Sequence, residues 1–178
     1  MKKLYFFLTA IFIMNQCFSQ SYTRITQSKI TFQIRNMGFN VSGNIGGLQA
    51  DIQFNPTQLG SSTIVATVDA NTINTDNDGR DEHLKKEDYF DIAHYPKISL
   101  KSVSLKHKNG INYSGGFEVT IKGRTILIEI PFSYSETGNS ILLKGVFKLN
   151  RLDFGIGDSS LILSNEVAVN IEIEANKP

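Results

Sequence analysis

The densest group of side chains that could do chemistry lies in one segment, residues 71–96. Within it Asn74, Asp76 and Asp78, followed by a glycine, match the opening of an EF-hand loop, where oxygen ligands for calcium occupy alternate positions. That loop needs a bidentate carboxylate at its twelfth position, and this sequence has Lys85 there. Because a cation cannot ligate calcium, the sequence argues against a calcium site.

The histidines and the single cysteine do not form a recognisable metal site. His83, His94 and His107 are too widely spaced for the HxH or HExxH patterns in which histidines hold zinc. Cys17 lies in an N-terminal segment that is expected to be removed. The sequence therefore predicts no metal and no cofactor, and it predicts that the histidines are solvated or cap local structure.

Arg80 and Asp81 are the charged pair that most invites a catalytic interpretation. Neighbouring residues on a helix point to different sides, so the pair lacks the geometry of a dyad. The chain also has no nucleophile elbow or phosphate loop. We predict a structural salt bridge from this pair to Arg151 and Asp153, in the second irregular segment, residues 150–161. A catalytic role would require a carboxylate or histidine with a strongly perturbed pKa.

Residues 1–19 have the layout of a cleaved secretory signal peptide. Two lysines form a basic n-region, residues 4–14 form an apolar core, and Ser19 is the small residue before the cleavage site. The apolar run is too short for a stable membrane span, so the protein is expected to be periplasmic or secreted. Acylation of Cys17 is the weaker alternative, because no small residue precedes that cysteine.

Cleavage after Ser19 would leave one domain over residues 20–178, which is long enough for a sizeable core. The mature chain would have no cysteine, so its stability must come from burial and hydrogen bonding. It would carry 16 basic and 17 acidic residues, two lysines fewer than the 18 basic residues of the full chain. Without a basic excess, nucleic acid is not expected as a partner.

Most of the mature chain alternates apolar and polar residues with the period of two that indicates a half-buried strand. Two runs change phase, one at Gly46-Gly47 and one between Leu100 and Val103. A bulge or bend at these points would keep the apolar face inward. The eight predicted strands cover residues 28–35, 39–54, 61–70, 98–105, 111–121, 126–134, 141–149 and 167–173.

Eight strands joined mostly by short turns predict an all-β antiparallel meander. Such a meander either splits into a sandwich or closes into a barrel, and only closure removes the exposed edges. Alternation fits both, and we predict an eight-stranded antiparallel β-barrel because the connections are short and sequential. The interior of such a barrel is just wide enough to be filled by side chains or to hold one small ligand.

The inward face of the predicted strands is apolar and uncharged from residue 111 onward. Such a lining suits an apolar ligand rather than a charged one. Gly43, Gly115 and Gly145 occupy inward positions, where the missing side chains favour a cavity. Glycine is also found where barrel strands bend, so an interior filled by side chains remains the alternative.

Residues 71–96 interrupt the alternation between the third and fourth predicted strands. Asp78 as N-cap, followed by further acids, predicts a short helix over residues 80–87. Leu84 would face inward from this helix, and Tyr89-Phe90 would tuck beneath it. We expect this segment to sit at the mouth of the barrel.

The same segment resembles the signature of the YceI-like, polyisoprenoid-binding family. The residues that carry the resemblance are Asn74, Thr75, Arg80, Asp81, His83, Leu84, Asp88, Tyr89, Phe90, Asp91, Tyr95 and Pro96. A second set similar to a family signature is Asn150, Arg151, Asp153, Phe154 and Gly155. The first strands are also similar, around Met37-Gly38, but Asn36 stands where family members usually have histidine.

The resemblance implies an exported, lipocalin-like barrel that holds an amphiphilic isoprenoid, such as a quinone or a polyprenyl lipid, in an apolar tunnel. It implies binding rather than catalysis. The alternative is a secreted enzyme that acts on a lipid-like substrate at the barrel mouth, and it requires a carboxylate or histidine with a strongly perturbed pKa that faces the cavity. The inward residues expected to contact the tail are Phe32, Ile34, Val41, Phe117, Val119, Ile128, Phe132, Phe147 and Val169. The residues expected to shape the mouth, more by bracing than by touching ligand, are Arg80, Asp81, His83, Arg151 and Asp153. The sequence leaves open the identity of the lipid and whether the protein forms a homodimer.

Overall fold

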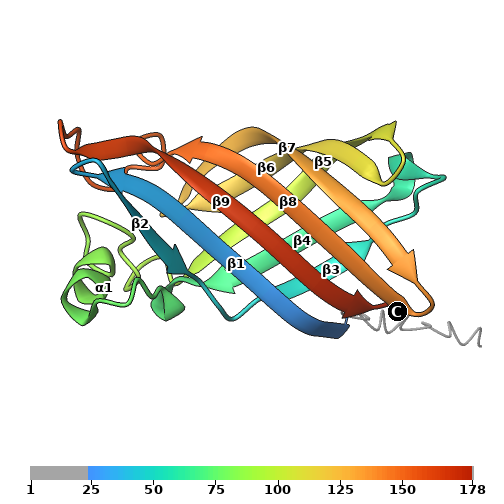
Figure 1. The fold of residues 1–178 in the computed structure, drawn as a ribbon, viewed down its shortest axis with the longest axis horizontal. Coiled ribbons are helices and arrows are strands. Elements are labelled where there is room, and N and C mark those ends of the chain that lie inside the picture. Colours follow the sequence, from blue (N-terminus) through green and yellow to red (C-terminus); the bar gives the residue numbers. More distant parts are fainter. Residues whose placement is uncertain (1–23, 178) are drawn as a thin grey trace, which may run out of the picture.

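The computed structural model describes residues 24–177, which form one antiparallel sheet curled into a barrel (Figure 1). The strands are β1 (Arg24–Asn36), β2 (Phe39–Asn44), β3 (Gln49–Gln53), β4 (Thr63–Asp69), β5 (Lys97–Asn109), β6 (Asn112–Ile121), β7 (Arg124–Thr137), β8 (Ser140–Asn150) and β9 (Leu163–Asn176). The predicted signal peptide lies outside the described residues. Within residues 24–177 no helix is long and apolar enough to cross a membrane.

The sheet has nine strands, so the predicted count of eight was wrong. The second predicted strand is in fact two, β2 and β3, because the chain leaves the sheet at residues 45–48. Gly47 makes this turn with φ +69°, and a Cβ on it would lie only 2.8 Å from the Cβ of Asp69. The phase change at Gly46-Gly47 therefore marks a real bend, as predicted, and the bend is sharp enough to end one strand and begin another.

The first and last strands pair with each other, which closes the barrel on that side. The β1–β9 ladder runs from the Arg24–Asn176 pair to the Asn36–Leu163 pair. The strand order is β2-β1-β9-β8-β7-β6-β5-β4-β3, so β2 and β3 are the two edges of the sheet. Although these edges are consecutive in the chain, no ladder joins them among the described residues.

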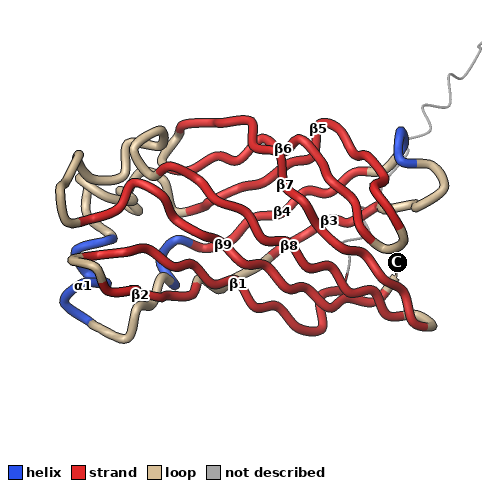
Figure 2. Tube along the Cα trace, turned by 45° about the horizontal axis from the view of Figure 1, so that its top comes forward, coloured by secondary structure: helices blue, strands red, loops and turns tan. Residues whose placement is uncertain are grey.

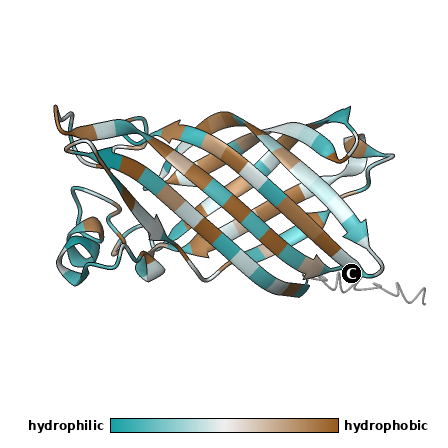
Figure 3. Cartoon of the chain, viewed as in Figure 1, coloured by the Kyte–Doolittle hydropathy of each residue, from teal (hydrophilic) through white to brown (hydrophobic). Residues whose placement is uncertain are grey.

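Alternation along the strands gives one face to the core and the other to solvent, as Figure 3 shows along β1, β9 and β8. The second predicted phase slip is a bulge in β5. The register with β6 shifts between Ser102 and Ser104, and the extra residue, Val103, points outward with 51% of its surface exposed. This outward residue lets Leu100 and Leu105 both pack against the core.

The helical segments lie at the two ends of the barrel, and the wall between them is strand (Figure 2). They are η1 (Leu59–Ser61), η2 (Ala70–Thr72) and α1 (Asp78–Leu84). Helix α1 begins two residues earlier than predicted and ends three residues earlier. Its N-cap is Asn77 rather than Asp78, because the Asn77 side chain accepts a hydrogen bond of 2.9 Å from the backbone N–H of Arg80.

Candidate functional site: an apolar cavity in the barrel

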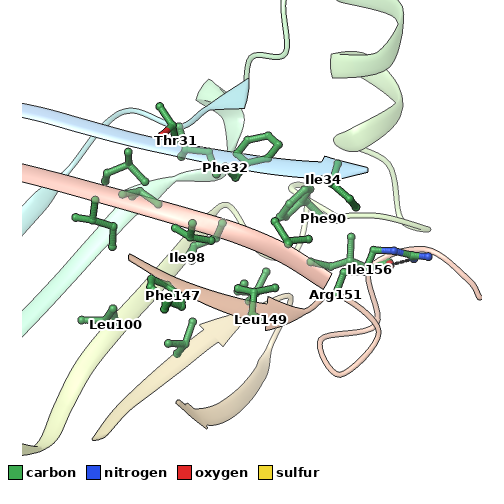
Figure 4. Close-up of a pocket in the computed structure, with 18 of the residues that line it drawn as sticks. Thr31, Phe32, Ile34, Phe90, Ile98, Leu100, Phe147, Leu149, Arg151 and Ile156 are labelled. Carbon is green, nitrogen blue, oxygen red and sulfur yellow. Dashed lines mark hydrogen bonds between the residues drawn. The ribbon is translucent and has the colours of Figure 1, made fainter. Parts of the chain in front are cut away.

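The barrel encloses an apolar cavity of about 560 Å³, within the usual range for small-molecule sites. Its lining comes from strands on opposite sides of the wall. Figure 4 shows Phe32 of β1, Leu100 of β5 and Phe147 of β8 directed into one shared space. A space lined in this way can hold a hydrocarbon chain, and it offers little to a charged ligand.

One end of the cavity is closed by a cluster of four rings, Phe54, Tyr113, Phe132 and Tyr134. The Phe54 ring lies at the centre of this cluster, with centroid distances of 5.0 Å to Tyr113, 5.8 Å to Phe132 and 4.4 Å to Tyr134. Phe132 belongs to the cluster and also lines the cavity. The rings therefore form the floor of the cavity.

The other end is covered by a lid, which we define as residues 74–96 and which includes α1. Leu84, Tyr89 and Phe90 line the cavity from the lid. Leu84 therefore faces inward from α1, as predicted. Arg80 and His83 also reach the lining. The mouth of the cavity therefore combines apolar side chains with the polar side chains of Thr75, Arg80 and His83, whereas the floor is built of rings.

Thr75 is the centre of the hydrogen bonds that hold the lid in shape. The Arg80 guanidinium donates to the Thr75 hydroxyl and to the Thr75 carbonyl, each over 2.7 Å. The Thr75 hydroxyl and N–H donate in turn to the buried Asp81 carboxylate. The hydroxyl bond lowers the pKa of Asp81 below its usual value, against the burial that raises it. Arg80 and Asp81 thus meet through a threonine.

Arg151 organises the second irregular segment in a similar way. Its side chain is 2% exposed, and the guanidinium donates to the carbonyls of Ser164, Ile156 and Asp158 over 3.0, 2.7 and 2.7 Å. A fourth bond of 3.2 Å reaches the Asn165 side chain. Figure 4 shows the bond to Ile156, whose side chain lines the cavity. Arg151 therefore shapes the rim by holding backbone.

Eight of the nine residues predicted to contact a tail line the cavity. They are Phe32, Ile34, Val41, Phe117, Val119, Phe132, Phe147 and Val169. The exception is Ile128, which is half-buried against the core and is not part of the lining. Ile128 faces the core as alternation predicts, and it lies on β7 beyond the Phe132–Gly145 pair, where the ladder with β8 ends.

The predicted mouth residues divide into two groups. Arg80, His83 and Arg151 line the cavity, whereas Asp81 and Asp153 do not. The predicted salt bridge was wrong. Among the described residues, no ion pair joins Arg80 or Asp81 to the second irregular segment, residues 150–161. Each arginine instead binds nearby oxygen atoms that carry no formal charge.

Thr75 is the residue that sequence reasoning missed, although it stands within the quoted motif. A threonine just before a helix often bonds to local backbone, and that preference was the available signal. The contact with Arg80 five residues later and with Asp81 six residues later follows from the fold of the loop. Spacing alone does not show it.

The inward glycines do not all make space. A Cβ on Gly43 would lie 2.4 Å from the Phe32 ring, and one on Gly115 would lie 2.7 Å from the Ser104 carbonyl. These two glycines allow close packing, so for them the predicted contribution to a cavity was wrong. A Cβ on Gly145 would have no neighbour closer than 3.6 Å, and Gly145 lines the cavity.

The histidines lie apart and each has its own local partner. His83 pairs with Asp88 over 3.0 Å, His94 pairs with Asp91 over 2.8 Å, and His107 contacts the carbonyl of Gly110. The Asn74 side chain accepts a bond from the backbone of Asp76. Residues 24–177 contain no group of three or more His, Cys, Asp or Glu side chains placed to hold a metal ion.

These features define a class: a small antiparallel barrel with an apolar bore, a ring floor and a hydrogen-bonded lid. The sequence profile of the YceI-like domain matches residues 23–175. The chain therefore belongs to the YceI-like family.

Relatives and solved structures agree with this assignment. A UPF0312 protein of Vibrio cholerae is 22% identical over 141 residues, which cover 75% of this chain and 75% of that protein. The crystal structure of BcnA from Burkholderia cenocepacia is similar with a TM-score of 0.82 and 20% identity, covering 86% of this chain and 99% of that one. A polyisoprenoid binding domain from Saccharophagus degradans has a TM-score of 0.72 at 14% identity, covering 88% and 98%. These similarities show the fold.

Proposed function

We propose that the protein is an exported lipid-binding protein that carries or sequesters an amphiphilic isoprenoid, such as a quinone or a polyprenyl lipid. The observation that carries this proposal is the shape of the cavity: a bore of about 560 Å³ with an apolar wall, closed at one end by rings. The similar domain from Saccharophagus degradans, described as polyisoprenoid binding, supports the same class of ligand.

The driving force would be transfer of the tail out of water, at about 0.8 kcal/mol for each buried methylene. This attraction has no direction along the tail, so the wall would accept many chains of suitable length. The head group would remain near Arg80 and His83, two of the polar lid residues that line the cavity. Discrimination among lipids would therefore arise at the mouth.

The arrangement of carboxylates favours binding over catalysis. The alternative of a secreted enzyme requires a perturbed acid or base that faces the cavity. Asp81 and Asp88 both have a lowered pKa, and each is held by a hydrogen bond within the lid, from Thr75 and from His83 respectively. Neither aspartate lines the cavity. Both are therefore placed to brace the lid.

The proposal can be tested by filling the bore. In Gly145→Leu a new side chain would grow from the wall into the cavity, because a Cβ there meets only ordinary contacts. Native mass spectrometry of wild-type protein from its own host should detect a long apolar ligand, and the variant should lose it. Gly60→Leu is the matched control, because a Cβ on Gly60 has no neighbour within 4 Å and Gly60 is not part of the lining.

Two results would contradict the proposal. One is wild-type protein that is consistently empty and takes up no polyprenyl probe. The other is a correctly folded Gly145→Leu protein that binds the same ligand as well as the Gly60→Leu protein does.

A further inference from the structure

The rim of the barrel carries an exposed apolar surface, which we call the tip. It consists of Met37 and Phe39 in the β1–β2 hairpin and Leu161 and Ile162 in the loop before β9. Met37, Phe39 and Ile162 are 67%, 76% and 58% exposed, and Leu161 is fully exposed. The two segments touch, because the Met37 N–H donates to the Ile162 carbonyl over 2.8 Å. Four large apolar side chains thus share one exposed surface.

The backbone of the hairpin holds this surface in an unusual conformation. Asn36 pairs with Phe39, so Met37 and Gly38 form a two-residue turn, with φ angles of +52° and +83°. Turns with positive φ at both central positions favour Asn-Gly, and a methionine there is uncommon. A large apolar side chain at an exposed, disfavoured position contributes little to folding, so a role in contact with a partner explains it better.

The tip is also uncharged. Residues 36–41 and 159–165 contain no acidic or basic side chain, and the charged side chain that shares a shallow pocket with Leu161 and Ile162 is the cation Arg35. By contrast, at the opposite end of the barrel β5 carries Lys108 just before its turn into β6, and β7 carries Glu136 just before its turn into β8 (Figure 1). An uncharged apolar projection on one end of the molecule suits insertion among lipids better than contact with a charged surface.

The tip is continuous with the mouth of the cavity. Asn36 and Leu163, the immediate neighbours of Met37 and Ile162, both line the cavity. Figure 1 shows the β1–β2 turn and the loop before β9 at the same end of the barrel as α1. An apolar tail that entered the cavity from a bilayer pressed against this end would not need to cross water.

We propose that the tip docks on the surface of a lipid bilayer, with Phe39 and Leu161 inserted among the lipids and the mouth facing the membrane. This inference rests on the proposed function, because it supplies the route by which an isoprenoid tail would pass between membrane and cavity. The cost of exposing a tail to water grows with every methylene, so direct contact with the bilayer favours transfer.

Flotation with vesicles of phosphatidylethanolamine and phosphatidylglycerol tests the inference. Wild-type protein should float with the vesicles. The double variant Phe39→Ser with Leu161→Ser should have a vesicle partition coefficient at least about tenfold lower. The matched control is Leu127→Ser with Val146→Ser, which removes two apolar side chains, 64% and 59% exposed, from the outer wall of the barrel. The control should float like wild type.

Flotation of the tip variant at the wild-type level, or no flotation of wild type, would overturn the inference. So would a wild-type dimer that the tip substitutions convert to monomer, because the tip would then belong to a second copy of this chain. Uptake of a short prenyl probe from solution separates this inference from the proposed function. The tip variant should bind that probe as wild type does, whereas failure of wild type to bind it would count against the cavity and not against the tip.

Discussion

The two ends of the barrel are built by different kinds of interaction. At the floor, Phe54 packs edge-on against Tyr113 and Phe132, and of these three rings only Phe132 lines the cavity. At the lid, Arg80 and Arg151 bind oxygen atoms of the chain itself and hold two irregular segments above the bore. Ring packing fills space, whereas hydrogen bonding to backbone fixes a loop without filling the space beneath it.

This difference explains how one continuous β wall can be solid at one end and hollow at the other. The wall residues are apolar along its whole length, so their type alone does not determine which part is filled. Large rings at facing positions fill the floor. Beyond the rings the interior stays open, because Gly145, the strand partner of Phe132, adds no side chain, and Leu100 and Leu149 nearer the mouth are aliphatic.

The largest effect is expected when the support of the lid end is removed. Arg151→Met would leave four oxygen acceptors without their buried donor, and we expect a loss of about 3–5 kcal/mol in the free energy of unfolding. Urea denaturation measures it. Arg35→Met, at an exposed arginine, should change stability by about 0.5 kcal/mol or less. Equal effects of the two substitutions would show that the bonds of Arg151 do not support the rim.

A smaller effect is expected at the floor. Phe132→Leu would remove one ring of the cluster while keeping an apolar side chain. It should lower the free energy of unfolding by about 2 kcal/mol. Because Phe132 separates the rings from the bore, the variant should also accept a longer tail, which a chain-length series of polyprenyl probes measures. Phe32→Leu changes the wall instead of the floor, and should leave the preferred length unchanged. A Phe132→Leu protein with unaltered length preference would contradict the assignment of the floor.

Thr75→Val should loosen the lid and leave the floor intact. The change removes the hydroxyl shared by Arg80 and Asp81, and we expect a loss of about 1–2 kcal/mol. It should also raise the pKa of Asp81 toward its usual value, because the hydroxyl bond is the largest cause of the lowering. Hydrogen exchange should accelerate within residues 74–96 and stay unchanged in β6 and β7. Thr120→Val, at a threonine whose hydroxyl bond is exposed, is the control.

The smallest effect is a pH dependence confined to the lid. The bond to Asp91 raises the pKa of His94 above its usual 6.5, so the charged pair stabilises the lid fully below that pH. The contribution is lost as pH rises through the raised pKa, because the histidine then becomes neutral. Protection factors of the lid amides, which correct hydrogen exchange for its intrinsic pH dependence, should therefore be higher below pH 6.5 than well above it. His94→Gln should abolish that difference, and a difference that persists in the variant would point to another group.

Much of this fold could be predicted because alternation is a local signal. It located every strand and marked both the bend at Gly46-Gly47 and the bulge near Val103. It could not show that the bend divides one run into β2 and β3, because strand pairing depends on distant partners. It placed Ile128 on the inward face, but it could not show that Ile128 lies outside the cavity lining, because the end of the β7–β8 ladder is a feature of the whole sheet.

The candidate site was less predictable than the fold. Inward residues were correctly placed because their position follows from the pleat. The partners of Arg80 and Arg151 were predicted to be charged groups, whereas they are carbonyls and polar side chains within their own segments. Which oxygen atom an arginine reaches depends on how an irregular loop turns, and no periodic pattern encodes that.

A crystal structure of the full-length protein purified from its own host tests the central claim most directly. We predict continuous elongated density in the bore, starting at the Phe132 ring and ending beside Arg80 and Phe90. A bore occupied by the protein's own rearranged side chains, or by ordered water alone, would contradict the claim that this barrel holds an apolar chain.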